Sequence, residues 1–315
     1  MQSVLILGSQ GMLGQALVQF FSSKGVYEVI GWDREDLDIS DEKLLREKVT
    51  ELWPDYILNA CAYNAVDLCE VDDAQYQKAL NINGYIPGVL AGIAKDLQSV
   101  FVHYSTDYVF DGERPRYRYE GRAPGCCGSG CSGCSYRSPD GTFDGYREVD
   151  APNPISRYGK TKYEGEKSVE KEGDHYYIFR LSKLFGIPGT SSTAKKSFFE
   201  IISERAKNKE EIRLVDDEIS CFTYAPDLAQ KTEEILTSGL APGIYHLINQ
   251  GAETWYSAGK KYFETANISA DLRAVSSKEF KRNALRPKQS TLISTKTVTM
   301  RHWENALLDY MKYLA

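Results

Sequence analysis

The sequence has no surplus of positive charge and no long apolar run. Its 38 Lys and Arg residues are set against 44 Asp and Glu residues, giving a formal net charge of −6. It therefore lacks the basic footprint of a protein whose main partner is nucleic acid. No apolar segment reaches the length that crosses a bilayer. The first residues, MQSVLILGSQG, predict a strand and a glycine turn in place of a signal peptide. We expect a cytoplasmic protein with no membrane or nucleic-acid partner.

Cysteine is scarce over most of the chain. Cys61, Cys69 and Cys221 stand alone, and because cytosolic thiols stay reduced we interpret them as small packing residues. The other four cysteines lie in GCCGSGCSGC at 125–134. Only one pair there has the two-residue gap typical of zinc ligands, and no histidine is near. We interpret the segment as a flexible or lightly ordered loop and predict no metal site. A metal-binding loop and an engineered insert remain the alternatives.

The order of apolar patterns predicts the fold class. With 315 residues, 42% hydrophobic and 26% charged, the chain suffices for one large globular domain or two. Alternation of apolar runs with helical spacings predicts an α/β fold with a doubly wound parallel sheet. The expected strands are 3–8, 28–33, 56–61, 99–106, 176–186, 211–217 and 244–249. The expected helices are one after the first strand and 41–52, 73–96, 158–172, 194–208, 226–236 and 301–314. The pattern breaks at 112–157, and 254–295 reads as shorter mixed elements.

A glycine triplet follows the first strand. GSQGMLG places Gly8, Gly11 and Gly14 three residues apart, ahead of an amphipathic helix. Without a Cβ the chain can turn sharply, so that a diphosphate can approach the backbone and the helix N-terminus. In this context the triplet predicts dinucleotide binding. At the end of the second strand, Asp33 favours NAD through its ribose, whereas Arg34 favours NADP through a 2′-phosphate. The choice stays open.

One tyrosine and one lysine have the spacing of a carbonyl-reductase pair. In SRYGKTKYEGEK, Tyr158 and Lys162 lie on one face of the expected helix. A nearby ammonium would lower the pKa of the phenol and so help it to protonate a substrate oxygen. The same spacing occurs in Tyr163–Lys167 and Tyr256–Lys260. We favour Tyr158 because it opens the helix that follows HYSTDYVFDG, whose Thr106 could hold the substrate oxygen.

Several motifs together give the chain a family resemblance. It resembles the extended short-chain dehydrogenase/reductases, and most closely the dTDP-4-dehydrorhamnose reductase family, over nearly its whole length. The motifs that carry the resemblance are GSQGMLG, LNACAYNAVDLCE, HYSTDYVFDG, NPISRYGKTKYEGE, VDDEISCFTYAPDLA, GIYHLINQG and LRPKQSTL. The resemblance implies a Rossmann-like domain at 1–186 that has an insertion at about 113–145 and also receives 223–249 and the C-terminal helix. A smaller, mainly substrate-binding domain would occupy 187–315.

The resemblance also implies an activity and its residues. The expected reaction is NADPH- or NADH-dependent reduction of the 4-keto group of a nucleotide-diphosphate deoxysugar by a monomer or homodimer. Tyr158 would donate the proton, Lys162 would serve tyrosine and cofactor, and Thr106 and Asp107 would touch the sugar. Arg286, in a basic stretch, would suit the diphosphate. Besides the glycines, Arg34, Tyr158 and Lys162, the cofactor-lining positions would be Met12, Leu13, Asp33, Asp38, Ile39, Ala62, Tyr63, Asn64 and Tyr104.

One departure from the family pattern and two alternatives accompany this interpretation. RLSK puts Lys183 where the family usually has a tryptophan that contacts the sugar, so Lys183 joins the expected substrate-binding residues and the particular sugar stays open. A dehydratase or epimerase of the same superfamily is one alternative, although Tyr108 follows Asp107 where a dehydratase needs a further acid. The other is a non-catalytic regulatory subunit like the relatives that partner methionine adenosyltransferase.

Overall fold

The structure, a computed structural model, describes residues 1–113, 116–118, 142–191 and 196–314. Its largest element is a sheet of six parallel strands in the order β12-β7-β4-β3-β1-β2. The chain passes from β1 to β2 on one side and continues with β3 on the other, which makes the β1/β3 boundary the topological switch point. The strands are β1 (Gln2–Leu7), β2 (Tyr27–Trp32), β3 (Tyr56–Asn59), β4 (Val100–Thr106), β7 (Tyr176–Leu181) and β12 (Gly243–His246). The expected α/β fold class is confirmed.

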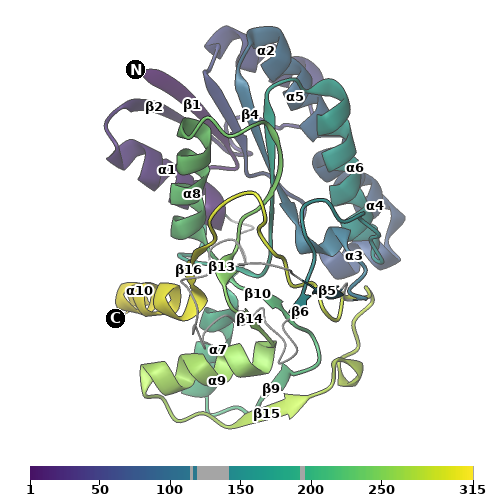
Figure 1. The fold of residues 1–315 in the computed structure, drawn as a ribbon, viewed down its shortest axis with the longest axis vertical. Helices are drawn as coiled ribbons and strands as arrows, with labels where there is room; N and C mark the ends of the chain where they lie inside the picture. Colours follow the sequence, from purple (N-terminus) through teal and green to yellow (C-terminus); the bar gives the residue numbers. More distant parts are fainter. Residues whose placement is uncertain (114–115, 119–141, 192–195, 315) are drawn as a thin grey trace.

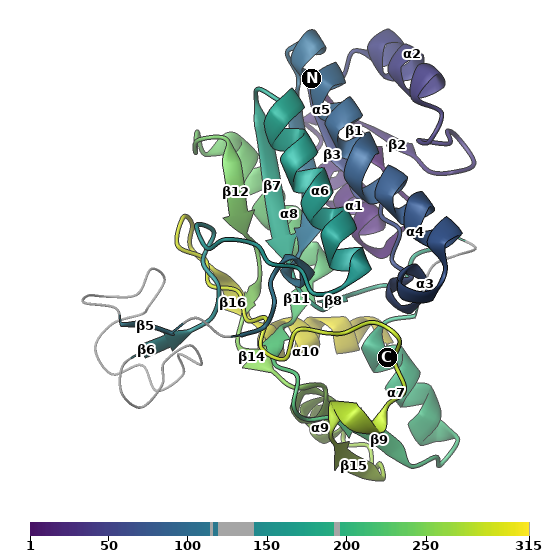
Figure 2. The same ribbon diagram turned by 90° about the vertical axis from the view of Figure 1, so that its right-hand side faces the viewer.

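Helices cover both faces of this sheet (Figures 1 and 2). Successive residues of β1 point to opposite faces, so Val4 and Ile6 enter one core cluster and Leu5 and Leu7 the other. The first cluster is closed by α1 (Met12–Ser23) and α8 (Ala225–Thr237), and the second by α2 (Glu42–Leu52), α5 (Ile86–Leu97) and α6 (Arg157–Glu172). Both faces are buried, which explains why successive residues of β3 are all buried and do not alternate between buried and exposed.

The helix expected at 73–96 is divided. It consists of α4 (Asp73–Ala79), a π-helical segment at Leu80–Tyr85, and α5. The added residue of the wider turn lets the buried side chain of Asn83 leave the helix register and bond to a neighbouring loop. A short helix that the sequence analysis did not expect, α3 (Val66–Val71), precedes α4.

A second group of elements packs below the carboxyl end of the sheet in the view of Figure 1. Its aromatic-rich core cluster joins α7 (Phe198–Lys207), α9 (Trp255–Ala266) and α10 (Trp303–Leu314). The pair β9 (Ile212–Val215) and β15 (Leu272–Val275) is parallel. The remaining short strands are β8 (Leu184–Phe185), β10 (Ser220–Cys221), β11 (Thr223–Tyr224), β13 (Asn249–Gln250), β14 (Ala252–Glu253) and β16 (Met300–His302).

The C-terminal helix differs from its expected place. We expected the dinucleotide-binding domain to receive it, but Trp303, Leu307 and Tyr310 of α10 are buried in the core cluster that holds α7 and α9. The physical reason is the aromatic side of α10, which finds its partners in rings such as Phe199 and Phe222. Unlike α10, two elements of the segment 223–249 pack with the main sheet, because α8 packs on α1 and β12 extends the sheet.

The segment expected to be irregular contains one described pair of strands. β5 (Arg116–Arg118) and β6 (Thr142–Asp144) are antiparallel neighbours that stand out to the side of the molecule in Figure 2. The predictions about the cysteine run at 125–134, including its loop and metal-site alternatives, fall outside the described residues.

Candidate active site

The glycine turn forms a cradle that only small residues allow. Gly8 has φ +77°, and a Cβ on Gly14 would lie 2.0 Å from the carbonyl oxygen of Gly8. The neighbouring chain is also close to Gly8, because a Cβ on Gly8 would lie 3.0 Å from the backbone N of Cys61. Gly11 caps α1 without any side-chain hydrogen bond. The first turn of α1 therefore presents its backbone N–H groups at the switch point, as a dinucleotide diphosphate requires.

The end of β2 braces this cradle. The carboxylate of Asp33 accepts a hydrogen bond from the backbone N of Gln10 (2.9 Å) and another from the backbone N of Arg34 (2.8 Å). The Arg34 side chain is exposed beside it. Further along, Asp38 accepts from the hydroxyl of Ser40 (2.7 Å), and hydrogen bonds from Ser40 lower the pKa of Asp38. Asp33 thus holds the glycine turn.

Asn83 fixes the loop that follows β3. Its amide oxygen accepts from the backbone N of Tyr63 (2.8 Å), and its amide nitrogen donates to the carbonyl of Tyr63 (3.0 Å) and to Thr161 (3.1 Å). The exposed residues Ala62 and Asn64 flank Tyr63. The sequence analysis missed Asn83, although an asparagine and a glycine inside an otherwise apolar helix were an available signal.

Tyr158 reaches this loop from the first turn of α6. Its hydroxyl donates to the amide oxygen of Asn64 (3.3 Å), and its ring packs edge-on against Tyr108 with ring centres 5.8 Å apart. Ser156 starts the helix here by accepting from the backbone N of Gly159 (3.1 Å). Burial raises the pKa of Tyr158, and the hydrogen bond with Thr106 opposes this shift. The phenol is therefore protonated at neutral pH.

The relation of Lys162 to Tyr158 differs from the sequence-based expectation. We expected the ammonium to lower the pKa of the phenol, but the Lys162 amine donates to the carbonyl oxygen of Tyr104 (2.6 Å) and lies 3.3 Å from Nε2 of His103. The lysine is 2% exposed. This burial lowers the pKa of Lys162 to about 8, although Glu166 opposes the shift. In this arrangement burial of the phenol outweighs any help from the amine.

The side chain of Tyr104 points away from the candidate site. We expected it to line the cofactor, but its side chain lies in the core cluster under α1 and α8 and shares a hydrogen bond with Thr232 (3.0 Å). The alternation of side chains along β4 turns it away from the lysine. Only its carbonyl oxygen reaches the candidate site, as the acceptor for Lys162.

Asp107 is enclosed by hydroxyl groups. Its carboxylate is 3% exposed and accepts from Thr106 (3.1 Å), Ser182 (3.1 Å) and Ser290 (2.5 Å). Burial raises its pKa, and these three hydrogen bonds oppose the rise. Thr106 also accepts from the backbone N of Tyr108 (3.2 Å). We expected Asp107 to touch the sugar, whereas its observed contacts tie β4 to β7 and to the segment that carries Ser290.

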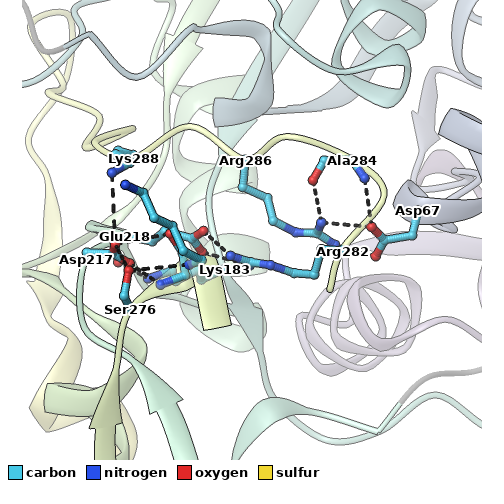
Figure 3. A network of polar contacts seen from close by, with 11 residues as sticks. Asp67, Lys183, Asp217, Glu218, Ser276, Arg282, Ala284, Arg286 and Lys288 are labelled. Carbon is cyan, nitrogen blue, oxygen red and sulfur yellow. Dashed lines mark hydrogen bonds and ion pairs between the residues drawn. The ribbon is translucent and has the colours of Figure 1, made fainter. Parts of the chain in front are cut away.

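Most of the basic side chains in the stretch around Arg286 already pair with carboxylates. The segment 281–290, hereafter the strap, crosses between the two groups of elements, and Figure 3 shows its polar contacts. Arg286 donates to both carboxylate oxygens of Asp67 on α3 (2.9 and 2.6 Å), and this contact lowers the pKa of Asp67 to about 2. Arg282 pairs in the same bidentate way with Glu218. A diphosphate at Arg286 would have to share this guanidinium with Asp67.

Lys183 meets an aromatic ring that the sequence analysis did not connect with it. Its amine donates to the carbonyl oxygen of Glu253 (3.0 Å) and lies 4.3 Å from the ring centre of Trp255, at the start of α9. Phe222 lies on another side at 4.9 Å. Burial lowers the pKa of Lys183 to about 7, against the opposing effect of Asp107. Lys183 thus places its amine against a tryptophan from the second group of elements, where a cation–π contact stabilises the charged form of the amine.

The described residues show neither a metal cluster nor a membrane-spanning helix. There, no group of three or more His, Cys, Asp or Glu side chains has an arrangement that could hold a metal ion. No helix within the same ranges is long and apolar enough to span a membrane.

Fold and site together define a Rossmann-like α/β protein that has a glycine cradle and a buried Tyr–Lys helix at its switch point. The chain matches the model of the RmlD substrate binding domain over residues 1–315, and it belongs to this family. It is 30% identical to the spore coat polysaccharide biosynthesis protein SpsK of Bacillus subtilis over 99% of this chain and 98% of that one. It is 29% identical to a dTDP-4-dehydrorhamnose reductase of Aggregatibacter actinomycetemcomitans, with 99% of each chain covered. The crystal structure of the Bacillus anthracis dTDP-4-dehydrorhamnose reductase in complex with NADP superposes with a TM-score of 0.82 at 30% identity, again with 99% of each chain covered.

Proposed function

We propose that the protein is an NADPH- or NADH-dependent reductase of the 4-keto group of a nucleotide-linked deoxysugar, and specifically that it converts dTDP-4-dehydrorhamnose to dTDP-L-rhamnose. The observation that carries the proposal is the buried phenol of Tyr158, hydrogen-bonded to Asn64 on the loop beside the glycine cradle. Relatives that bear the name of this reductase cover almost the whole chain and support the assignment. In this proposal the enzyme works in the cytoplasm as a monomer or homodimer.

The residues present fit a nicotinamide dinucleotide. Gly8, Gly11 and Gly14 leave the space in which a Cβ would obstruct the diphosphate. Asp33 faces the ribose, and Arg34 is free to reach a 2′-phosphate, so both cofactor forms stay compatible. When bound, the cofactor supplies the hydride. The cofactor is further lined, in this proposal, by the loop Ala62–Asn64 and by Lys162.

The chain's own groups then handle the substrate oxygen. Tyr158 is protonated because its pKa is raised, so it can give its proton to the oxygen on which negative charge develops. Thr106, which is partly exposed and bonded to Tyr158's neighbour Tyr108, orients that oxygen. Asp107 holds Thr106 by accepting from it, and is a positioning residue. Arg286 binds the diphosphate and Lys183 faces the sugar from the second group of elements, which we assign as mainly substrate-binding.

The proposal is tested by mixing the purified full-length chain with dTDP-4-dehydro-6-deoxy-L-mannose and with NADPH or NADH, and by following the loss of reduced-nicotinamide absorbance. We expect Tyr158→Phe to lower kcat by about 10²- to 10⁴-fold while cofactor affinity is kept. Tyr163→Phe, one turn further along α6, is the matched control and should leave kcat within about twofold of the unmodified enzyme.

Two outcomes would contradict the proposal. Undiminished turnover by Tyr158→Phe removes the assigned acid. Tight cofactor binding by the unmodified protein without turnover of any nucleotide 4-keto sugar favours the regulatory-subunit alternative instead.

A further inference from the structure

A buried histidine stands behind Lys162. His103 on β4 has 0% exposure, and its ring is stacked on Phe101. Its Nε2 lies 3.3 Å from the amine of Lys162, and its Nδ1 lies 3.3 Å from the amide nitrogen of Asn59 on β3. Both neighbours are groups that ordinarily donate hydrogen bonds. A neutral imidazole, however, has one N–H and one acceptor nitrogen, so only one neighbour can be a donor to it.

Asn59 decides which nitrogen carries the proton. Its amide oxygen accepts from the backbone N of Cys61 (3.2 Å), and the amide nitrogen is thereby turned toward His103. An amide nitrogen can only donate, so Nδ1 of His103 must accept. The ring proton then lies on Nε2 and points at the amine of Lys162. This network, rather than an observed hydrogen, fixes the tautomer.

We propose that His103 is a positioning residue for Lys162: locked by Asn59 as the tautomer with Nε2–H, it donates a hydrogen bond to the Lys162 amine and thereby favours the neutral amine over the ammonium. An ammonium has three donors and no acceptor, so it would face Nε2–H with an N–H of its own. The neutral amine accepts from Nε2–H and still donates to the carbonyl oxygen of Tyr104. The proposal deepens the proposed function and rests on it for the role of Lys162.

The charged groups around the pair agree with this arrangement. Burial, with the Lys162 charge second, lowers the pKa of His103 far below its usual value, so the imidazole is neutral. Burial likewise lowers the pKa of Lys162 to about 8, while Glu166 on α6 and Cys61 after β3 raise it. Glu166 is largely neutralised because it accepts two hydrogen bonds from Arg180 on β7 and one from Ser105 on β4. Tyr158 on α6 is protonated.

The tautomer can be measured without any enzyme assay. The chain has four histidines, so long-range ¹H–¹⁵N spectra of histidine-labelled protein without added cofactor are simple, and His103→Phe identifies the signal. We expect His103 to show a neutral ring with its proton on Nε2 from pH 6 to pH 9. A proton on Nδ1, or a ring that becomes charged in this range, would overturn the proposal.

A second variant tests the effect on Lys162. Asn59→Asp gives Nδ1–H an acceptor, which should switch the tautomer, turn Nε2 into an acceptor and favour the ammonium. We expect the limb of the kcat/KM profile that Lys162 sets to move upward by about 1 pH unit. Because the new carboxylate also stabilises the ammonium by its charge, the shift supports the proposal only together with a proton on Nδ1 of His103 in the spectrum of Asn59→Asp. Asn81→Asp, at a partly exposed position of the π-helical segment, is the control whose profile should not move.

The two measurements distinguish a failure of the His103 proposal from a failure of the proposed function. If Asn59→Asp switches the tautomer in the spectrum but leaves the profile in place, the proposal is wrong. If Asn59→Asp does not fold, the spectrum of the unmodified protein still decides the tautomer on which the proposal depends. If the unmodified protein shows the Nε2–H tautomer but reduces no nucleotide sugar, the proposed function fails and the histidine assignment stands.

Discussion

At the scale of single residues, the candidate site is built from polar groups held where water cannot reach them. Lys162 is the clearest case, because it is an amine with 2% exposure on a helix that also carries exposed charges such as Lys167. Burial of a cation is unfavourable unless it is paired. A buried amine beside Tyr158 is expected if Lys162 has a functional role, and it is not expected if the role of Lys162 is only structural.

The cost of this burial gives a pH-dependent prediction. The pKa of Lys162 falls from 10.5 to about 8 on folding, so between these values the unfolded chain binds more protons and stability rises with pH. Below pH 8 the full penalty of about 3 kcal/mol applies. Lys162→Met removes it and loses one hydrogen bond worth about 1 kcal/mol. At pH 7 we expect a gain of about 2 kcal/mol in the free energy of unfolding.

Denaturant unfolding at pH 7 and pH 10 measures this gain. It should shrink at the higher pH, where the unmodified lysine is neutral in the folded protein. Lys167→Met on the exposed side of α6 is the control and should change stability by less than about 0.5 kcal/mol at either pH. A Lys162→Met variant that is less stable at pH 7 than at pH 10, relative to the unmodified protein, would show that the amine is charged and well solvated.

Some of these residues could be predicted from the spacing of residues that are close in sequence, and others could not. Gly8, Gly11 and Gly14 belong to one turn, and Tyr158 with Lys162 to one helix face, so sequence neighbours carried the signal. His103 contacts Lys162 over 59 positions of sequence and Asn59 over 44. Nothing in the sequence near His103 indicates its tautomer. The raised pKa of Tyr158 was mispredicted for the same reason, because neither the burial of the phenol nor the electrostatic effect of Tyr108 and Asp107 is a local property of the sequence.

At the scale of elements, the division of the 73–96 helix has a clear cause. Apolar spacing continues through α4 and α5, so the sequence predicted one helix. The π-helical segment between them places Asn83 in contact with both backbone groups of Tyr63. Such insertions in helices are often functional, and here the turn supports the loop that carries Asn64.

Asn83→Ala tests this support. The change removes the hydrogen-bond partner of the partly buried N–H and carbonyl of Tyr63, which we expect to lower the free energy of unfolding by about 1–3 kcal/mol. Because the loop at 62–64 then loosens, NADPH affinity should fall by about tenfold or more. Fluorescence titration of the purified variant with NADPH measures this affinity. Asn81→Ala is the control within the same segment, and an Asn83→Ala variant with unchanged NADPH affinity would separate the π-helical turn from cofactor binding.

At the scale of the whole molecule, the strap joins the two groups of elements across the site. Arg286 bonds to Asp67 over 219 positions of sequence, and Ser290 to Asp107 over 183. The family resemblance implied a diphosphate contact for Arg286 but could not reveal that Asp67 already holds it. Similarly, the amphipathic pattern predicted the last helix, but its aromatic partners in α7 and α9 come from distant segments, and its place was therefore wrong in the sequence analysis.

Arg286→Ala should raise the KM for the nucleotide sugar by about tenfold or more and change kcat less. The reason is that the diphosphate is bound far from the carbon that reacts. Initial rates at varied sugar concentration separate the two constants. Lys281→Ala, an exposed residue of the same strap, is the control. A fall in kcat with an unchanged KM would place Arg286 outside the diphosphate site.

In the proposed reaction a cofactor hydride is transferred to C4 of a nucleotide-linked sugar while Tyr158 protonates the oxygen. The most direct measurement uses NADPH that carries deuterium at the reactive position of the nicotinamide, with dTDP-4-dehydro-6-deoxy-L-mannose as substrate, and analysis of the product sugar by NMR and mass spectrometry. We predict one deuterium, at C4, formed by the unmodified protein and almost absent with Tyr158→Phe. A product without deuterium at C4, or one formed equally well by Tyr158→Phe, would contradict this account.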